Sequence, residues 1–204
     1  MLSYKTIEPD TLELLRNLSG EKALGNVRLV GGTSLALQYG HRNSVDLDFF
    51  GNIGEENDEF KEILRKYGKL SILKESKSIN VYIVNGIKID IVNYKYPWID
   101  NVIEEDGLRL AAPTDIAAMK VNAIEGRGTK KDFIDIYFLL QHFSLNDILR
   151  FYQKKYPENS IFRALMSMTY FDDADRQIMP KMFVNITWEA IKINIKEIVD
   201  HYSE

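Results

Sequence analysis

The sequence contains no cysteine, so it can form neither a disulfide framework nor a thiolate metal site. It also has no apolar run close to the roughly 20 residues that cross a bilayer. Its first residues, Met1 to Lys5, lack the apolar segment of a signal peptide. These absences lead us to expect a cytoplasmic protein with no membrane segment.

An excess of positive charge is also missing. The net charge is -4, which argues against a protein that coats nucleic acid nonspecifically. Only residues 109–155 carry a positive surplus, with 8 basic and 5 acidic side chains. A polyanion would find its attraction in that segment.

No Pro/Gly/Ser-rich spacer divides the chain, although its composition shifts near residue 108. The length of 204 residues allows one large domain or two small ones that share an interface. We expect an α+β protein, with a mixed β-sheet core and flanking helices in residues 1–108 and a mainly helical domain in residues 109–204.

Hydrophobic periodicity and turn residues predict the individual elements. Asn85-Gly86 is the strongest two-residue hairpin signal, because a type I′ turn needs positive φ at both positions. The predicted strands are 27–30, 45–50, 69–74, 79–84, 87–94 and 108–111. The predicted helices are 11–18, 34–39 with Thr33 as its cap, 55–67, 113–125, 130–142, 145–155, 159–170 and 187–202.

Two carboxylates, Asp46 and Asp48, lie two residues apart on a predicted strand, so both side chains leave the same face. Val45, Leu47 and Phe49 are expected to point into the core. At about 5 Å and an effective dielectric near 20, the repulsion between two carboxylates is roughly 3 kcal/mol. A divalent cation with oxygen ligands would offset it. The alternative is a solvated face of an edge strand.

Gly31 and Gly32 lie between a predicted strand and the next helix. Glycine lets backbone N–H groups approach a phosphate closely, and a helix N-terminus adds partial positive charge. A plain tight turn is the alternative. Residues 33–45 separate this turn from Asp46, so one strand–turn–helix–strand unit would bring a phosphate site beside the two acids.

Asp90 is a candidate third metal ligand. In the strand after the Asn-Gly turn, Lys88, Asp90 and Val92 share one face. If that face meets Asp46 and Asp48, the three acids would form a two-metal phosphoryl-transfer site. Taken alone, Asp90 would be an ordinary surface aspartate.

These residues resemble a known family. Residues 31–37, Gly-Gly-Thr-Ser-Leu-Ala-Leu, and 41–50, from His-Arg-Asn-Ser to Asp-Phe-Phe, are similar to the AbiEii-type nucleotidyltransferase toxins of bacterial toxin–antitoxin systems. That family belongs to the DNA polymerase β-like superfamily. A second block agrees: Thr114, Lys120 and Arg127 precede residues 131–137, Lys-Asp-Phe-Ile-Asp-Ile-Tyr. Arg127 stands four residues before Lys131, a departure from the family spacing of Arg-x-Lys.

The resemblance implies a nucleotidyltransferase core and a helical domain that closes over it. It implies Mg²⁺ (or Mn²⁺) at Asp46 and Asp48, and a nucleoside triphosphate in contact with Lys120. Asp132 or Asp135 would orient the triphosphate or act on the acceptor. Family members that modify tRNA ends point to an RNA acceptor, and a protein hydroxyl is second. A cognate antitoxin protein is a further expected partner.

The residues themselves support some of these roles. Lys120 shares a helix with apolar neighbours, so its stem can pack while its ammonium reaches a phosphate. Asp132 and Asp135 lie three apart on one helical face, where Lys131 and Arg127 can pair with them. Such a cluster can equally be structural. Arg42 and Ser44, just before the acidic strand, can bind triphosphate oxygens or merely order the loop.

The leading hypothesis is a nucleotidyltransferase that uses Mg²⁺ and a nucleoside triphosphate to place a nucleotide on an acceptor hydroxyl. A catalytically silent binding module of the same fold is the first alternative. The Asp46/Asp48 pair disfavours it, because a binding module need not maintain repelling acids. A metal-dependent nuclease is the second, but it leaves Gly31-Gly32 unexplained.

Overall fold

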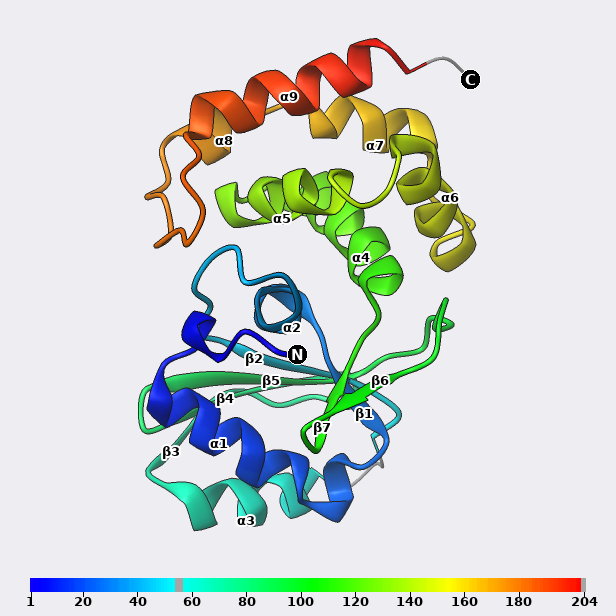
Figure 1. Cartoon of the computed structure of the whole chain (residues 1–204). Coiled ribbons are helices and arrows are strands. Elements are labelled where there is room, and N and C mark those ends of the chain that lie inside the picture. Colours follow the sequence, from blue (N-terminus) through cyan, green and yellow to red (C-terminus); the bar gives the residue numbers. More distant parts are fainter. Residues whose placement is uncertain (54–56, 203–204) are drawn as a thin grey trace. The chain divides into compact units, whose positions relative to one another are not determined.

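The computed structural model describes residues 1–53 and 57–202, and these form two compact units (Figure 1). The first comprises Met1–Tyr96 and Val102–Ala111, and the second comprises Pro97–Asn101 and Ala112–Glu204. The first carries the β-sheet and the second is helical, which confirms the predicted α+β class. The domain boundary between residues 108 and 109 stays a prediction, because a compact unit is not in itself an independently folding domain.

Within the described residues, the first unit contains one seven-stranded sheet in the order β3-β4-β5-β2-β1-β7-β6. The strands are β1 Val27–Leu29, β2 Leu47–Gly51, β3 Leu70–Lys74, β4 Ile79–Val84, β5 Ile87–Asn93, β6 Ile103–Glu105 and β7 Leu108–Leu110. β2 is parallel to β5 and β1 is parallel to β7, while the other neighbours are antiparallel. β2, the strand with the acidic motif, is therefore the central strand.

Two hairpins depend on residues with positive φ. Asn85 and Gly86 have φ of 50° and 88° between β4 and β5, which confirms the predicted type I′ geometry. Asp106 and Gly107 repeat the pattern, with φ of 52° and 77°, between β6 and β7. Strand β6 is absent from the sequence prediction, and its Asp-Gly signal would have identified it.

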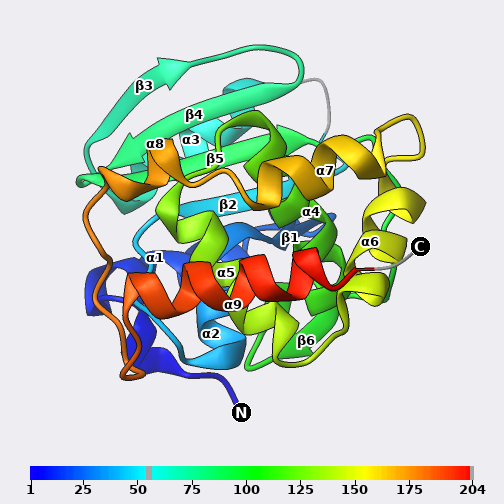
Figure 2. The ribbon, with the colours of Figure 1, turned by 90° about the horizontal axis from the view of Figure 1, so that it is seen from above.

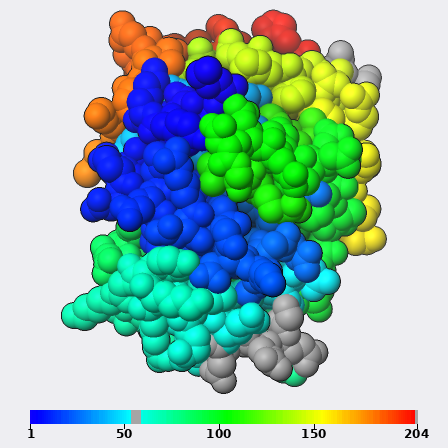
Figure 3. Space-filling model, turned by 60° about the horizontal axis from the view of Figure 1, so that its bottom comes forward, coloured from blue at the N-terminus to red at the C-terminus, as the bar shows by residue number. Residues whose placement is uncertain are grey.

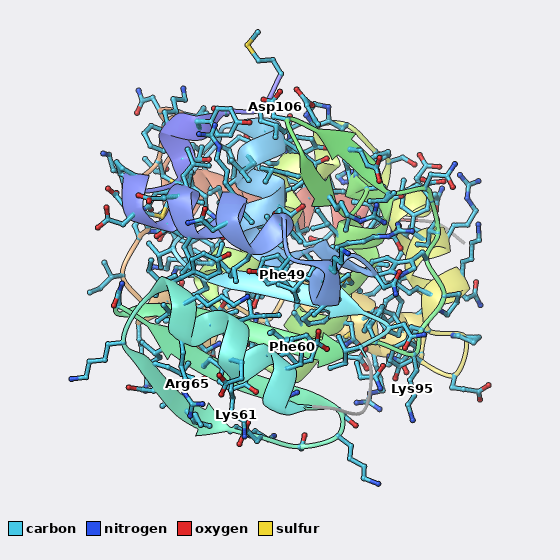
Figure 4. All side chains as sticks on the ribbon, turned by 90° about the horizontal axis from the view of Figure 1, so that it is seen from below. Phe49, Phe60, Lys61, Arg65, Lys95 and Asp106 are labelled. Atoms are coloured by element: carbon cyan, nitrogen blue, oxygen red, sulfur yellow. The ribbon has the colours of Figure 1, made fainter. Side chains whose placement is uncertain are left out.

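Helices cover both faces of the sheet (Figure 1). α1 (Pro9–Ser19) and α3 (Asn57–Tyr67) pack on the face that holds the apolar core, and α2 (Gly31–Tyr39) lies on the other face. Figure 4 shows Phe49 of β2 and Phe60 of α3 on the α1/α3 side. On the outer surface there, N-terminal residues in blue adjoin turquoise residues of the α3–β3 region (Figure 3). Two short 3-10 helices, η1 (Tyr4–Thr6) and η2 (Lys22–Leu24), complete the unit.

Helix starts differ from the sequence prediction in the first unit. α1 begins at Pro9 rather than at residue 11, because proline occupies the first helical position without losing a needed N–H. The predicted start of the helix 55–67, Glu55-Glu56, lies outside the described residues.

The second unit is built around α4, which packs against α5, α6 and α7. α9 crosses over α5 and also contacts α7 (Figure 2). The helices are α4 Pro113–Gly126, α5 Lys130–Leu140, α6 Leu145–Lys155, α7 Ile161–Met168, α8 Asp172–Asp175 and α9 Trp188–Asp200. α8, a single turn, was not predicted. None of the helices described is long and apolar enough to cross a membrane.

A fully buried ion pair joins the segment Pro97–Asn101 to this helical unit. Lys155 Nζ lies 2.7 Å from Asp115 Oδ1, and both side chains are 0% exposed. The same ammonium donates to Pro97 O, and it lies 4.6 Å from the ring centroid of Trp98. Asp115 in turn accepts a hydrogen bond from the N–H of Ile99. Because both ions also bond to backbone groups of the segment, the pair fixes its path.

We expect Lys155→Met to lower the free energy of unfolding by about 3–5 kcal/mol, because it leaves the Asp115 carboxylate buried without its cation. Urea denaturation monitored by circular dichroism measures this. Lys154→Met, which removes an exposed neighbouring charge, should change the free energy by less than about 0.5 kcal/mol. Equal stability of the two variants would show that the buried Lys155–Asp115 pair does not stabilise the fold.

Candidate active site

The acidic motif lies where β2 begins. Leu47 and Phe49 are buried in the core, so Asp48 points to the opposite face, the one that carries α2. Asp46 directly precedes the strand. The prediction that Val45 points into the core is wrong: Val45 is 41% exposed, because the strand begins only at Leu47.

The glycine pair forms the first turn of α2 rather than a turn that precedes it. The helix begins at Gly31, with Val30 as its N-cap, so the prediction of Thr33 as the cap is wrong. Gly31 has φ of 67°, and a Cβ built on it would overlap Asp48 Oδ2. Glycine at this position therefore permits the Asp48 carboxylate to lie directly against the helix N-terminus. There it meets the partial positive charge of the helix dipole.

Thr33 and Ser44 connect the helix to the loop before β2. Thr33 Oγ1 donates a short hydrogen bond to the backbone O of Asp46, and it lies 2.9 Å from Ser44 Oγ. Both residues are buried. These contacts fix the backbone at Asp46 relative to the glycine turn.

Arg42 presents its guanidinium to the same turn. The side chain is buried, and Nη1 donates to Asn43 O at 2.9 Å. A Cβ on Gly32 would overlap Arg42 Nη2 and would lie 3.2 Å from Ser44 Oγ. The second glycine thus permits a buried positive charge to approach the first turn of α2.

Asp90 lies beside Asp48 in the sheet. The two residues are register partners on the parallel strands β5 and β2, so their side chains leave the same face of neighbouring strands about 4.8 Å apart. Asp90 Oδ2 is 2.6 Å from Lys88 Nζ. Asp90 Oδ1 is buried and has no hydrogen-bond partner within the described residues.

These residues fit a divalent cation only in part. No group of three carboxylate or imidazole side chains in the described ranges is close enough to form a complete ligand set. Asp48 and Asp90 nevertheless lie side by side, and the unpartnered Asp90 Oδ1 is an oxygen of the kind that Mg²⁺ binds. Because Mg²⁺ usually takes one or two carboxylates and completes its shell with water and substrate phosphates, the arrangement suits a cation that arrives with a triphosphate.

The remaining predicted site residues form a second cluster, in the helical unit. Lys120 Nζ on α4 lies 2.9 Å from Asp132 Oδ1 and 2.6 Å from Asp135 Oδ2 on α5. All three side chains are almost completely buried. Arg127 Nε adds a contact of 3.2 Å to Asp132 Oδ2, although its own side chain is 68% exposed.

Asp132 also caps α5. Its carboxylate accepts hydrogen bonds from the backbone N–H and hydroxyl of Thr129, in a capping box. Burial alone would raise the pKa of Asp132, but the charges of Lys120 and Arg127 and the Thr129 hydroxyl outweigh it and lower that pKa to about 2. The carboxylate is therefore ionised at neutral pH, and the cluster has a structural role in addition to any functional one.

The structure therefore brings the predicted residues together in two groups. The first unit contains Asp48 and Asp90 as register neighbours, the Asp46 backbone bound by Thr33, and Gly31, Gly32, Arg42 and Ser44 at the first turn of α2. The second unit gathers Lys120, Asp132 and Asp135. Each group has defined internal geometry, and their chemical roles stay predictions.

A family comparison agrees with the motifs that build these groups. The family model described as "Nucleotidyl transferase AbiEii toxin, Type IV TA system" matches residues 13–194. This chain belongs to the AbiEii nucleotidyltransferase toxin family. The protein aq_aa25 of Aquifex aeolicus (strain VF5) is 34% identical to it over 183 residues, which cover 86% of this chain and 87% of that protein.

Solved structures share the fold of this AbiEii-family chain. JHP933 from Helicobacter pylori has a TM-score of 0.61 at 20% identity, over 95% of this chain and 92% of that one. The antibiotic-resistance factor ANT(2″)-Ia has a TM-score of 0.54 at 14% identity, over 70% and 88%. The nucleotidyltransferase-type fold predicted from the sequence is confirmed.

Two residues of this AbiEii-family chain were not assigned roles from the sequence. Lys88 forms an ion pair with Asp90. The spacing of two residues, which puts both side chains on one strand face, was the sequence signal for this pair. Thr129 caps α5 through Asp132, and Thr-x-x-Asp immediately before an apolar helix resembles the capping-box signature.

The low pKa of Asp132 predicts a pH-dependent stability. Its pKa falls from 3.8 to about 2 on folding, so the stabilisation is present above about pH 4 and is lost as the pH falls through 2. The difference in unfolding free energy between the wild type and Asp132→Asn should shrink by about 2 kcal/mol between pH 5 and pH 2. Urea denaturation across this range measures it. Asp172→Asn, at an exposed carboxylate of α8, is the control, and an equal slope for both variants would contradict the prediction.

Proposed function

We propose that this chain transfers a nucleotidyl group from a nucleoside triphosphate to an acceptor hydroxyl, with Mg²⁺ or Mn²⁺ as cofactor. The observation that carries the proposal is the close approach of the Asp48 carboxylate to Gly31 at the N-terminus of α2, with Asp90 in register beside it. A triphosphate bound by the backbone amides there would lie next to carboxylates whose oxygens can bind a divalent cation.

In the proposed reaction, the acceptor hydroxyl oxygen attacks the α-phosphorus of the triphosphate. The bond from that phosphorus to the oxygen bridging to the β-phosphorus breaks, and pyrophosphate leaves. Asp90 Oδ1 fits the role of proton acceptor, because it is a buried carboxylate oxygen without a hydrogen bond in the described chain. A downstream aspartate of the second unit is the alternative base.

The other residues position these groups. Asp46 and Asp48 would hold the cation, which supplies neutralisation of the triphosphate and of the leaving pyrophosphate. Thr33 and Ser44 hold the Asp46 backbone in place. Arg42 sets positive charge against the first turn of α2, where it favours an anion.

Lys120 is the proposed triphosphate contact in the helical unit, and Asp132 and Asp135 would orient it. Its ammonium is bound by both aspartates, so a phosphate must compete with a carboxylate for it. A triphosphate carries more negative charge than one carboxylate, and it is therefore a ligand able to do so.

The proposed acceptor is RNA, with tRNA first and a protein hydroxyl second. The toxin–antitoxin description of the family supports an acceptor in the cytoplasm whose modification stops growth, and a cognate antitoxin. The positive surplus of residues 109–155 supports a polyanionic acceptor.

Transfer itself is tested with α-labelled nucleoside triphosphates, total RNA and Mg²⁺. We expect the wild type to transfer label to RNA. Asp48→Asn, which keeps the shape of the side chain but removes its charge, should lower the rate of transfer by about 100-fold or more. Glu13→Gln, at an exposed acid of α1, should transfer as the wild type does. Nucleotide binding without transfer would indicate the silent module, and shortened RNA would indicate the nuclease.

Growth arrest is the expected result of expressing the wild-type chain alone, because modification of an essential acceptor stops translation. Asp46→Ala should relieve it, as followed by colony counts at matched protein levels. Equal toxicity of the two proteins would separate the phenotype from this site.

A further inference from the structure

The Lys88–Asp90 pair puts a positive charge where the two register-paired acids need one. Asp48 and Asp90 are directly opposite on neighbouring strands, and at about 5 Å their repulsion is roughly 3 kcal/mol at an effective dielectric near 20. Lys88 leaves the same face of β5 two residues earlier. Its Nζ lies 2.6 Å from Asp90 Oδ2, closer than a water-separated pair would be.

The pair leaves one Asp90 oxygen available. Oδ2 is bound by the ammonium, whereas the buried Oδ1 has no hydrogen-bond partner in the residues described. In a site for two divalent ions, the Asp90 carboxylate would bind one of them. In this chain a protein cation already holds that carboxylate, in agreement with the lack of a three-acid ligand set among the described residues.

We propose that Lys88 is a built-in cation that takes the place of one divalent ion at the Asp48–Asp90 pair, so that the site takes a single divalent ion, the one that accompanies the triphosphate. The inference rests on the proposed function, because it assigns a charge-compensating role within that site. Lysine suits the role since its ammonium is a compact point charge on a flexible stem. Lys88 acts through Asp90 and is a positioning residue.

This role makes a counterintuitive prediction about metal binding. A lysine that merely keeps Asp90 in place would, when removed, weaken metal binding at the acids. Removal of a lysine that substitutes for a metal ion would leave two neighbouring carboxylates without that positive charge. Metal binding at the acids would then become stronger. The sign of the change therefore separates the two roles.

The experiment titrates Mn²⁺ alone into the full chain and follows the loss of the free-ion signal by electron paramagnetic resonance. We expect Lys88→Met to bind Mn²⁺ at least tenfold more tightly than the wild type and Lys88→Arg to stay within about twofold of it, since arginine keeps the charge. Lys95→Met, which removes an exposed charge outside β5, is the matched control. Unchanged or weaker binding by Lys88→Met, with a melting temperature near that of the wild type, would overturn the proposal.

If Lys88→Met folds poorly, Lys88→Gln replaces it, because glutamine keeps a polar end group without the charge. Tighter Mn²⁺ binding than that of the wild type is again expected. The labelled-transfer assay on the same preparations separates the two hypotheses. Transfer by the wild type without tighter Mn²⁺ binding by the variant overturns the lysine role and leaves the proposed function standing. Tighter binding by the variant, with no transfer by the wild type under any nucleotide, supports the lysine role and overturns the proposed function.

Discussion

Two carboxylates held side by side in the sheet are the constraint on which the rest of the candidate site depends. The parallel pairing of β2 and β5 sets Asp48 directly beside Asp90, and the register of the central strands fixes both backbone positions. Three features of the first unit compensate for this charge. Gly31 lets the N-terminus of α2 come against Asp48, Lys88 binds Asp90, and the buried Arg42 guanidinium lies at the same helix turn. Compensation by the protein is incomplete, because Asp90 Oδ1 lacks a partner within the described residues.

The helical unit solves a similar problem in a different way. There, Lys120 binds both Asp132 and Asp135, and Lys155 binds Asp115 with no exposure of either side chain. Each of these ammonium groups is surrounded by acceptors from its own unit. Such closed pairs stabilise a particular arrangement of helices once formed, because removing one partner leaves an uncompensated buried charge. The closed pairs therefore stabilise the helical unit, whereas in the first unit Asp90 Oδ1 has no hydrogen-bond partner within the described residues.

Local sequence signals predicted the elements well where the chemistry is local. Asn85-Gly86 fixes its hairpin through two positive φ angles, and the acidic strand and glycine pair were recognised from their spacing. Some errors are local, such as the missed hairpin at Asp106-Gly107, and others come from tertiary contacts. Thr33 was taken as a helix cap, but its hydroxyl binds the Asp46 backbone instead, a partner 13 residues away. The attachment of Pro97–Asn101 to the helical unit depends on Lys155 and Asp115, and no pattern within either segment reveals the pairing. The register that places Asp48 opposite Asp90 likewise arises from the order of the strands.

The contrast between the two clusters also bears on the proposed contact between Lys120 and a triphosphate. Its ammonium has two carboxylate partners, while Asp132 has further support from Arg127 and from the Thr129 cap. Asp132 can therefore release Lys120 and still keep Arg127 and the Thr129 cap as partners. A triphosphate that draws Lys120 away from Asp132 would leave that carboxylate with Arg127 and the cap, and it would keep Asp135 neutralised. The extra support at Asp132 therefore favours the proposed exchange of one Lys120 contact for a phosphate, because the Asp132 carboxylate would stay paired with Arg127 and the cap.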